Sequence, residues 1–209
     1  MRRTVAPSKI LCVGRNYRAH AAELDQEVPS EPLLFLKPPS SLIGSGDPIE
    51  LPPGVGRVDF EGEVAVVIGR RARRVEEDRA LEVVEGILPA NDVTARDLQR
   101  KDSQWTRAKG FDTFCAAGTP VAFESERWKE LSLTTRVNGE VRQSGRIADL
   151  VFPLPVLIAY ASRIMTLEPG DLLLTGTPAG VGPLKVGDEV EVEVSGVGTL
   201  RNPVRQVPE

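Results

Sequence analysis

Apolar and polar residues alternate with a period of two over much of the chain, and this pattern predicts a protein built mainly from β-strands. The clearest case lies in residues 185–204, where alternate valines from Val190 to Val194 share one face of a predicted strand. The glutamates from Glu189 to Glu193 take the opposite face. We therefore expect the valines to be buried and the glutamates to face solvent.

A different pattern marks residues 57–69, RVDFEGEVAVVIG, which also predict a strand. Asp59, Glu61 and Glu63 occupy every second position, so their side chains point to one face. The uninterrupted apolar run Val64–Ile68 that follows is typical of a strand buried on both faces. Like charges at the mouth of a buried strand repel one another and lose hydration. Either the face that carries the three carboxylates is exposed to solvent, or a positive charge lies against it.

Helical periodicity is limited to short segments. Residues 76–87 begin with acidic side chains and continue with apolar residues at helical spacing, which predicts a helix. Residues 154–171 carry an apolar helical face over a longer stretch, and this helix should stop at Pro169-Gly170. A short helix is also expected over residues 18–24, after a strand that ends in a turn.

Local turn signals place the remaining elements. Residues 88–102 predict a strand end that runs into a helix, in which Thr94 and Asp97 have the spacing of a capping box. Residues 133–145 predict a hairpin with a type I′ turn at Asn138-Gly139. Short strands separated by Gly and Pro, with a few helices between them, indicate a β-rich α+β fold.

The composition is that of an ordinary globular protein of 209 residues, with 41% hydrophobic and 27% charged residues. A net charge of −4 argues against a nucleic-acid partner, which calls for a basic patch. The arginine cluster at residues 70–74, RRARR, could bind an anion, but a solvated turn is the better explanation. No apolar stretch is long enough for a signal peptide or a membrane span, so we expect a cytoplasmic protein with no membrane partner.

The numbers of cysteine and histidine residues limit which disulfides and metal sites the chain can form. Cys12 and Cys115 are too few for a disulfide framework or a zinc cluster, and their apolar surroundings predict small buried residues in a reducing compartment. His20 is the only histidine, which excludes any metal site that needs several. A metal ion would be bound mainly by oxygen, which favours Mg²⁺, Mn²⁺ or Ca²⁺ over Zn²⁺.

Glu61 and Glu63 have the spacing that two monodentate ligands of one metal ion need, and Gly62 between them would let the backbone approach a neighbour on the other face. Asp92 is the best third ligand because it ends an apolar run at a strand-to-helix transition. The alternative is a solvated acidic edge strand, which is common in proteins. Against it, the strand that follows is too apolar for an edge, and Glu63 directly precedes its apolar run.

Three other features could carry chemistry. His20 and Glu23 are three residues apart on the predicted helix and can touch, so the carboxylate could orient the imidazole as a base; a surface pair is the alternative. Lys109 lies between two polar turns and could hold a substrate carboxylate or be merely solvated.

The loop LTGTPAGVG, residues 174–182, has no lysine after its glycines and is not a phosphate-binding loop. It could offer N–H groups and the Thr177 hydroxyl to an anion, or be a tight turn.

Taken together, the motifs resemble the fumarylacetoacetate hydrolase family over nearly the whole chain. Each motif is weak alone, but their number, order and spacing make a strong signal. The length of the chain and its opening segments are similar to those of the short single-domain branch, which includes acylpyruvate hydrolases and oxaloacetate decarboxylases. The segments that carry the resemblance are CVGRNYRAHAAEL, PLLFLKPPSSLIGSGDPI, DFEGEVAVVIG, NDVTARDLQ, AKGFDTF and LTGTPAGVG.

The resemblance implies one catalytic domain over residues 1–209, folded as layered mixed sheets that form a roll, and usually a homodimer. Residues 16–31 would form a lid segment over a small-molecule substrate. The cofactor would be Mg²⁺ or Mn²⁺, which answers the question of the positive charge beside the carboxylates. The implied roles are metal ligands Glu61, Glu63 and Asp92, catalytic residues His20, Glu23 and Lys109, and substrate-binding residues Arg15, Arg96, Gln99 and Thr177.

The activity that the resemblance implies is metal-dependent cleavage of C–C bonds in acylpyruvate-type 2,4-diketo acids, through an enolate that the metal stabilises. Decarboxylation of oxaloacetate would pass through the same enolate. The alternative is an isomerase or decarboxylase of aromatic catabolism that acts on 2-hydroxyhepta-2,4-diene-1,7-dioate or 5-carboxymethyl-2-hydroxymuconate. The predicted water-activating dyad favours hydrolysis, because isomerisation needs no attacking water.

Overall fold

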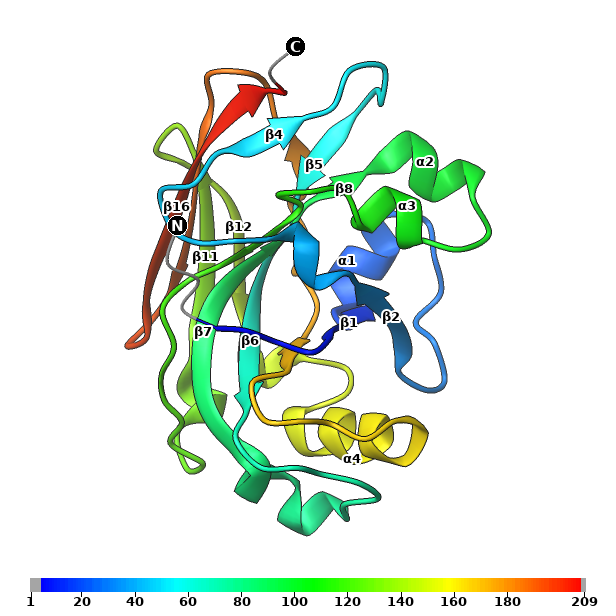
Figure 1. Cartoon of the computed structure of the whole chain (residues 1–209), viewed down its shortest axis with the longest axis vertical. Coiled ribbons are helices and arrows are strands. Elements are labelled where there is room, and N and C mark those ends of the chain that lie inside the picture. Colours follow the sequence, from blue (N-terminus) through cyan, green and yellow to red (C-terminus); the bar gives the residue numbers. More distant parts are fainter. Residues whose placement is uncertain (1–4, 208–209) are drawn as a thin grey trace.

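A computed structural model of the protein describes residues 5–207. Figure 1 shows a largely β-structure in which a long, curled sheet containing β6 and β7 runs past a second group of strands containing β11, β12 and β16. The strands of the largest sheet, in the order in which they pair, are β2 (Leu33–Lys37), β1 (Ile10–Gly14), β13 (Leu172–Leu174), β6 (Gly62–Ile68), β7 (Val84–Asp92), β9 (Cys115–Ala117) and β3 (Leu42–Ile43), with β10 (Val121–Ala122) paired to β7 beside this path.

Two smaller sheets and a few short helices complete the fold. The five-stranded sheet pairs in the order β12 (Glu140–Arg146), β11 (Ser132–Val137), β15 (Glu189–Val194), β16 (Gly198–Gln206) and β4 (Ile49–Leu51). The three-stranded sheet contains β14 (Gly182–Pro183), β5 (Val58–Phe60) and β8 (Thr94–Ala95). The α-helices are α1 (Arg18–Glu23), α2 (Arg96–Lys101), α3 (Thr106–Lys109) and α4 (Leu154–Ile164), and the 3₁₀ helices are η1 (Pro39–Ser41), η2 (Glu77–Val83), η3 (Trp128–Glu130) and η4 (Ile147–Asp149).

Strand β6 lies in the interior of the largest sheet, antiparallel to both β13 and β7. Val64, Val66 and Ile68 join one hydrophobic core, while Ala65 and Val67 join a second core on the opposite face. The uninterrupted apolar run is therefore explained, because both faces of β6 are buried. The structure confirms that this segment is not an edge strand, although the predicted single strand over residues 57–69 is divided into β5 and β6.

The alternating strand β15 packs the five-stranded sheet onto the same core. Val190, Val192 and Val194 are each 1% exposed and belong to the cluster that contains Val64 and Val66. The opposite face carries the glutamates, as predicted, but two of them are paired. The Arg136 Nη1 atom lies 3.0 Å from a carboxylate oxygen of Glu191 and 2.7 Å from one of Glu193, and Glu191 also accepts from Arg201.

Other local predictions hold for the hairpin and the cysteines. Strands β11 and β12 pair antiparallel, and Asn138 and Gly139 have φ values of 52° and 81°, which matches the predicted turn. Cys12 and Cys115 are buried and free, and burial raises the pKa of the Cys115 thiol to about 12. The strand-rich fold with few helices and curled mixed sheets is the β-rich α+β class that the sequence predicts. No helix in residues 5–207 is long and apolar enough to cross a membrane.

Three helix predictions need correction. The predicted helix over residues 76–87 is only a 3₁₀ helix to Val83, since the chain then enters β7 and pairs with β6. Pairing across the sheet outweighs the local helical pattern there. The helix from residue 154 ends at Ile164 and not at Pro169-Gly170, because Leu167 pairs with Ala72.

The capping box predicted at Thr94 and Asp97, in residues 88–102, is also wrong. Helix α2 has Ala95 at its N-cap, and no side chain caps it. The Thr94 hydroxyl donates to the Asp92 carbonyl instead, and the Asp97 carboxylate accepts from the Arg57 N–H and from Arg100. Neither side chain therefore caps the helix.

Candidate metal centre and active site

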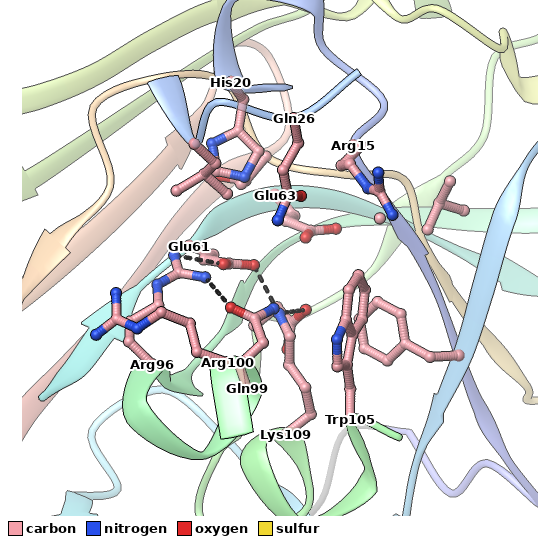
Figure 2. A pocket seen from close by; sticks show the side chains of 16 residues that line it. Arg15, His20, Gln26, Glu61, Glu63, Arg96, Gln99, Arg100, Trp105 and Lys109 are labelled. Carbon is pink, nitrogen blue, oxygen red and sulfur yellow. Dashed lines mark hydrogen bonds and ion pairs between the residues drawn. The ribbon is translucent and has the colours of Figure 1, made fainter. Parts of the chain in front are cut away.

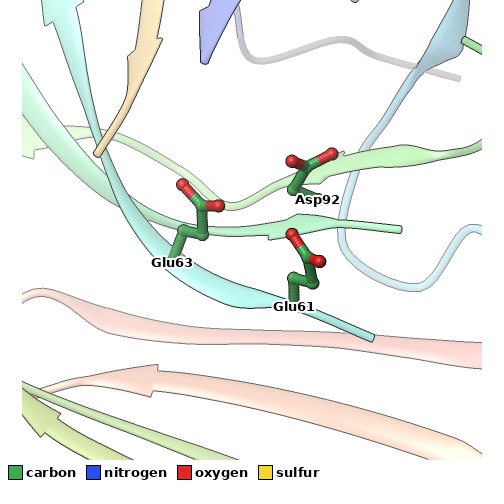
Figure 3. Close-up of side chains that lie close together, drawn as sticks. All are labelled: Glu61, Glu63 and Asp92. Carbon is green, nitrogen blue, oxygen red and sulfur yellow. The ribbon is translucent and has the colours of Figure 1, made fainter. Parts of the chain in front are cut away.

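Glu61, Glu63 and Asp92 come together on two neighbouring strands. Glu61 immediately precedes β6, Glu63 lies in β6, and Asp92 ends β7, which pairs antiparallel with β6. The Asp92 N–H donates to the Glu61 carbonyl over 2.9 Å, which fixes the two strand ends. One carboxylate oxygen from each residue lies within 4.8 Å of the others, and all three residues are buried. Figure 3 shows the three carboxylates converging from the two strands.

Gly62 makes this arrangement possible on the far side of the strand. A Cβ atom at Gly62 would lie 1.9 Å from the Thr135 Oγ1 atom and 3.2 Å from the Gln143 Oε1 atom. The Gly62 N–H donates to Gln143 Oε1 over 2.9 Å. The sequence-based expectation of a close backbone approach at Gly62 is therefore confirmed, and the approach comes from the five-stranded sheet.

Three buried cations neutralise part of the carboxylate cluster. The Lys109 Nζ atom lies 2.8 Å from Glu61 Oε2 and 2.7 Å from Asp92 Oδ2. Arg96 contacts Glu61 Oε1 through Nη2 at 2.6 Å. Lys37 Nζ lies 2.5 Å from the other oxygen of Asp92 and donates to the Val93 carbonyl. Lysine and arginine are rarely buried without a charged partner, and here each buried cation has one. The contacts therefore form a buried network of ion pairs.

Asp59, the first carboxylate of the alternating run, contacts arginines and not the other carboxylates. Arg57 and Arg96 both contact it, and it lies outside the group of carboxylates that could hold a metal ion. The Arg96 Nη1 atom also donates to Gln99 Oε1 over 2.8 Å. Asp59 and Gln99 therefore fix the guanidinium of Arg96 against Glu61.

Glu63 is the one carboxylate of the buried cluster that has no ion pair among the described residues. The other three are Asp59, Glu61 and Asp92, and they are contacted by the buried cations Lys37, Arg96 and Lys109 and by the half-exposed Arg57. Burial raises the pKa of Glu63 well above its usual range, and the charges of Asp92 and Glu61 raise it further.

These residues fit a hard divalent cation. The donor atoms are carboxylate oxygens, which Mg²⁺ and Mn²⁺ prefer. An unneutralised buried carboxylate beside two others is unfavourable on its own, and a cation would relieve it. Lys109, Arg96 and Lys37 contact both carboxylate oxygens of Glu61 and of Asp92, so these two side chains are held in fixed orientations.

His20 and Glu23 form a contact on α1, as their spacing predicts. The His20 Nδ1 atom lies 3.2 Å from Glu23 Oε2, and His20 is 4% exposed. The other carboxylate oxygen of Glu23 accepts from the Gly180 N–H over 3.0 Å. Glu23 is thus held between the helix and the loop after β13, and it orients the imidazole from outside the pocket.

The glycine-rich loop after β13 acts on the site through its backbone. The Gly176 N–H donates to Glu63 Oε2 over 2.7 Å. The Thr177 hydroxyl donates to the Gly62 carbonyl over 2.8 Å, and Gln143 donates to the same hydroxyl. The loop is therefore more than a turn, because its donors position Glu63 and Gly62 and Thr177 also lines the cavity.

A cavity of about 280 Å³ opens above the carboxylates. Figure 2 shows Arg96, Gln99 and Arg100 on one side of it, Trp105 on the other, and His20 and Gln26 facing the carboxylates. The lining residues are Val13, Gly14, Arg15, His20, Leu24, Gln26, Phe35, Glu61, Glu63, Asp92, Arg96, Gln99, Arg100, Trp105, Lys109 and Thr177.

Nine of the ten residues singled out from the sequence line this cavity, and Glu23 reaches it only through His20. Sequence reasoning missed Lys37, Phe35 and Trp105. Lys37 ends the segment LLFLK, which has the pattern of a strand with a solvated terminal lysine. Its partner Asp92 lies 55 residues further along the chain, so no local signal could reveal the contact.

The chain is similar to known proteins along nearly its whole length. Residues 9–205 match the family described as Fumarylacetoacetate (FAA) hydrolase C-terminal. The chain is 44% identical over 199 residues to the oxaloacetate tautomerase FAHD1, mitochondrial, of Arabidopsis thaliana, a match that covers 93% of this chain and 89% of that relative. It is 41% identical over 211 residues to the oxaloacetate tautomerase YisK of Bacillus subtilis (strain 168), which covers 95% of this chain and 70% of the relative.

Solved structures share the fold closely. A 5-carboxymethyl-2-hydroxymuconate delta-isomerase from Mycobacterium smegmatis superposes with a TM-score of 0.90 at 47% identity. That match covers 98% of this chain and 81% of the other.

Proposed function

The chain belongs to the fumarylacetoacetate hydrolase family, and on that premise we propose that it is a divalent-metal-dependent enzyme that moves a proton beside the keto group of a short 2-oxo acid. The first candidate reaction is the interconversion of the keto and enol forms of oxaloacetate. The observation that carries the proposal is the meeting of three buried carboxylates with His20 in one cavity. The names of the two tautomerase relatives support the choice of substrate.

Two cationic side chains of the cavity, Lys109 and Arg96, would stabilise the negative charge of the substrate. Burial lowers the pKa of Lys109 and of Arg96, but neighbouring carboxylates outweigh it and raise both pKa values above their ordinary range. Both side chains therefore stay protonated and can stabilise charge that develops on a substrate oxygen. A bound Mg²⁺ or Mn²⁺ would supply a Lewis acid at the keto oxygen.

His20 is the residue placed to carry the proton. Glu23 holds one ring nitrogen, which leaves the other to act as base and then as acid. In the keto-to-enol direction, the C–H bond beside the keto group breaks and an O–H bond forms. His20 takes the proton from carbon and returns it to oxygen, so the reaction needs no oxidant, reductant or co-substrate.

Hydrolysis of acylpyruvates, the activity expected from the sequence, is the second candidate. The observation that favours it is the same oriented imidazole, which could take a proton from a water molecule. Isomerisation of unsaturated 2-hydroxy diacids needs only proton transfer, and the name of the Mycobacterium smegmatis structure keeps it as a third possibility.

A panel of three substrates in Mg²⁺ separates these reactions. We expect the enol of oxaloacetate to turn over with the highest kcat/KM. Faster loss of acetylpyruvate would establish hydrolysis as the principal activity, and faster turnover of an unsaturated diacid would establish isomerisation. No turnover of any of the three would refute the proposal.

Four further points stay predictions. We propose one catalytic domain over residues 1–209, although residues 1–4 and 208–209 lie outside the described part of the chain. We also propose the lid segment 16–31, a homodimer and a cytoplasmic location. Sedimentation in solution would test the dimer.

A further inference from the structure

Gly62, the residue between two of the candidate metal ligands, lies where β6 loses its neighbour β13. The pairing of these strands ends where Leu174 lies opposite Ala65, and the chain turns away at Gly176, which has a φ of 103°. Had the pairing continued in the same register, Thr177 would lie opposite Gly62. The backbone N–H and C=O of Gly62 on that edge therefore have no strand to pair with. Because Gly62 is buried, both groups need other partners.

Two side chains take the place of the missing strand. The Gly62 N–H donates to Gln143 Oε1 over 2.9 Å, and the Thr177 hydroxyl donates to the Gly62 carbonyl over 2.8 Å. Gln143 Nε2 donates to the Thr177 hydroxyl over 2.7 Å and so joins the two contacts. We call this closed set of hydrogen bonds among Gly62, Gln143 and Thr177 the Gly62 ring.

The chemistry of its partners fixes the orientation of the Gln143 amide. The Gly62 N–H is a donor, so it requires the amide oxygen. The Pro178 carbonyl is an acceptor, so it requires the amide nitrogen, which lies 2.7 Å away. Both N–H groups of the amide are thus used, one by Thr177 and one by Pro178, and Gln143 is 1% exposed. Rotating the amide by half a turn would break these contacts.

Gln143 also holds the loop that follows β13, because its second N–H binds a carbonyl of that loop. At one end of the loop, the Gly176 N–H donates to Glu63 Oε2 over 2.7 Å. At the other end, the Gly180 N–H donates to Glu23 Oε1 over 3.0 Å. A single side chain on β12 therefore connects the backbone between the carboxylates with the loop that contacts Glu63 and Glu23.

We propose that Gln143 is a positioning residue of the metal centre, which acts through the Gly62 ring to direct the carboxylates of Glu61 and Glu63 at one point. Gln143 does not line the cavity, so it acts through other groups and not on a substrate. Side chains leave a strand in directions that the backbone sets, so a tilt of the Gly62 peptide would turn both flanking carboxylates. The inference rests on the proposed function for the metal ion that these carboxylates would bind.

The first measurement tests the Gly62 ring without any metal. Gln143→Met removes all three hydrogen bonds of the side chain at similar volume. It should speed hydrogen exchange of the Gly62 amide about tenfold or more, as measured by NMR on the metal-free protein. An unchanged exchange rate would overturn the inference, because Gln143 would then not hold Gly62.

Thr135→Val is the matched control for changes at this contact between sheets. Thr135 pairs with Gln143 across β11 and β12, and a Cβ atom at Gly62 would meet its hydroxyl. That hydroxyl has no hydrogen-bond partner among the described residues, so its removal leaves the Gly62 ring intact. Thr135→Val should therefore keep the wild-type exchange rate at Gly62 and the wild-type affinity for Mg²⁺.

Calorimetric titration with Mg²⁺ tests the consequence for the metal centre. Gln143→Met and Thr177→Val each open the Gly62 ring and should weaken Mg²⁺ binding about 10–100-fold. Thr177→Ser keeps the hydroxyl and should bind Mg²⁺ like the wild type. Because each change opens the same ring, the double variant Gln143→Met with Thr177→Val should bind no more weakly than the weaker single variant.

Wild-type affinity for Mg²⁺ in Gln143→Met would overturn the positioning role, and so would losses that multiply in the double variant. If Gln143→Met does not fold, Thr177→Val compared with Thr177→Ser carries both measurements. A wild-type protein that binds neither Mg²⁺ nor Mn²⁺ would refute the proposed function and the positioning role with it. The exchange rate of Gly62 would still decide whether the ring exists, so the two failures are distinguishable.

Discussion

Glu61 and Glu63 face the same cavity from positions two residues apart, yet their pKa values are shifted in opposite directions. Burial raises the pKa of both. At Glu61, Lys109, Arg96 and His20 outweigh burial and hold the pKa well below its usual range. At Glu63 burial and the charges of Asp92 and Glu61 raise the pKa, and they outweigh the Gly176 N–H and Lys109, which lower it. The protein's own cations therefore stabilise Glu61 as an anion. The anionic form of Glu63 would need an additional positive charge, such as a metal ion.

The first prediction compares Glu61→Gln with Glu63→Gln in the absence of metal. Glu61→Gln removes one of the two carboxylates that each of Lys109 and Arg96 contacts, and it should lower the free energy of unfolding by about 3 kcal/mol, or the melting temperature by roughly 6–12 °C. Glu63→Gln removes an uncompensated buried charge and should melt at the wild-type temperature or above it. Thermal unfolding in EDTA at neutral pH measures both, and Glu189→Gln on an exposed position is the matched control.

The effects of Glu61→Gln and Glu63→Gln on the free energy of unfolding should depend on pH in opposite ways. The raised pKa of Glu63 makes the wild-type protein lose stability as pH rises above the unfolded value of about 4.3. The gain from Glu63→Gln should therefore grow above that pH and vanish below it. The lowered pKa of Glu61 acts the other way, so the loss from Glu61→Gln should shrink as pH falls. Two variants of equal sign at neutral pH would contradict this assignment.

The second prediction concerns His20. Replacing it by Ala should lower kcat for tautomerisation and for acylpyruvate hydrolysis by about 10²–10⁴, because the proton carrier is lost. Oxaloacetate decarboxylation, which needs no attacking water, should be spared. Mg²⁺ affinity should stay at the wild-type value, since His20 is not among the carboxylate ligands. Steady-state kinetics with each substrate measures this, and retained hydrolysis would remove His20 from the mechanism.

A third prediction follows from the buried contact between Lys37 and Asp92. Lys37→Met removes the cation that holds one oxygen of Asp92 and should weaken Mg²⁺ binding about 10–100-fold. The exposed Lys101→Met, at the end of α2, has the same charge change and should bind Mg²⁺ like the wild type. Titration calorimetry with Mg²⁺ decides between them. Similar affinities in both variants would show that Lys37 does not orient the ligand.

The fourth prediction tests a structural carboxylate, Asp171, that does not line the cavity. Asp171 accepts from the Ser8 N–H, the Ser8 hydroxyl and the Glu168 N–H, and it pairs with Lys9. Burial raises its pKa, but these donors outweigh burial and lower it. Asp171→Asn should cost about 1–3 kcal/mol at neutral pH.

Because the folded pKa of Asp171 is lowered, its stabilisation exists above the unfolded value of about 3.9 and disappears as pH falls. Urea unfolding at pH 7 and near pH 3 should therefore show the difference between wild type and Asp171→Asn closing in acid. The exposed Asp112→Asn should show no difference at either pH. A gap that persists in acid would mean that the loss comes from packing and not from charge.

Local periodicity was enough to predict that the three candidate metal ligands lie together. The alternation of Glu61 and Glu63 before an apolar run fixes their common face, and the hairpin turn at Asn138-Gly139 depends only on its own two residues. Asp92 could be found because it ends a long apolar strand. In each case the deciding information lies within a few residues along the chain.

Contacts between distant segments could not be predicted in this way. Residues 84–87 have a helical pattern, but they pair with β6 because the sheet offers more burial than an isolated helix. Lys37 has the signature of a solvated strand end and is nevertheless fully buried against Asp92. Trp105 finds its place only because Gly14, far away in sequence, lacks a side chain. Such features depend on which surfaces the fold brings together.

The most direct test of the central claim follows the ultraviolet absorbance of the enol form of oxaloacetate. The reaction is run with protein and Mg²⁺, with excess EDTA, and with Mg²⁺ alone to subtract the protein-free rate. We expect the protein to accelerate loss of the enol, EDTA to abolish that acceleration, and added Mg²⁺ to restore it. A rate that is unaffected by the protein, or one that EDTA leaves intact, would contradict the assignment of a metal-dependent enol-forming site at Glu61, Glu63 and Asp92.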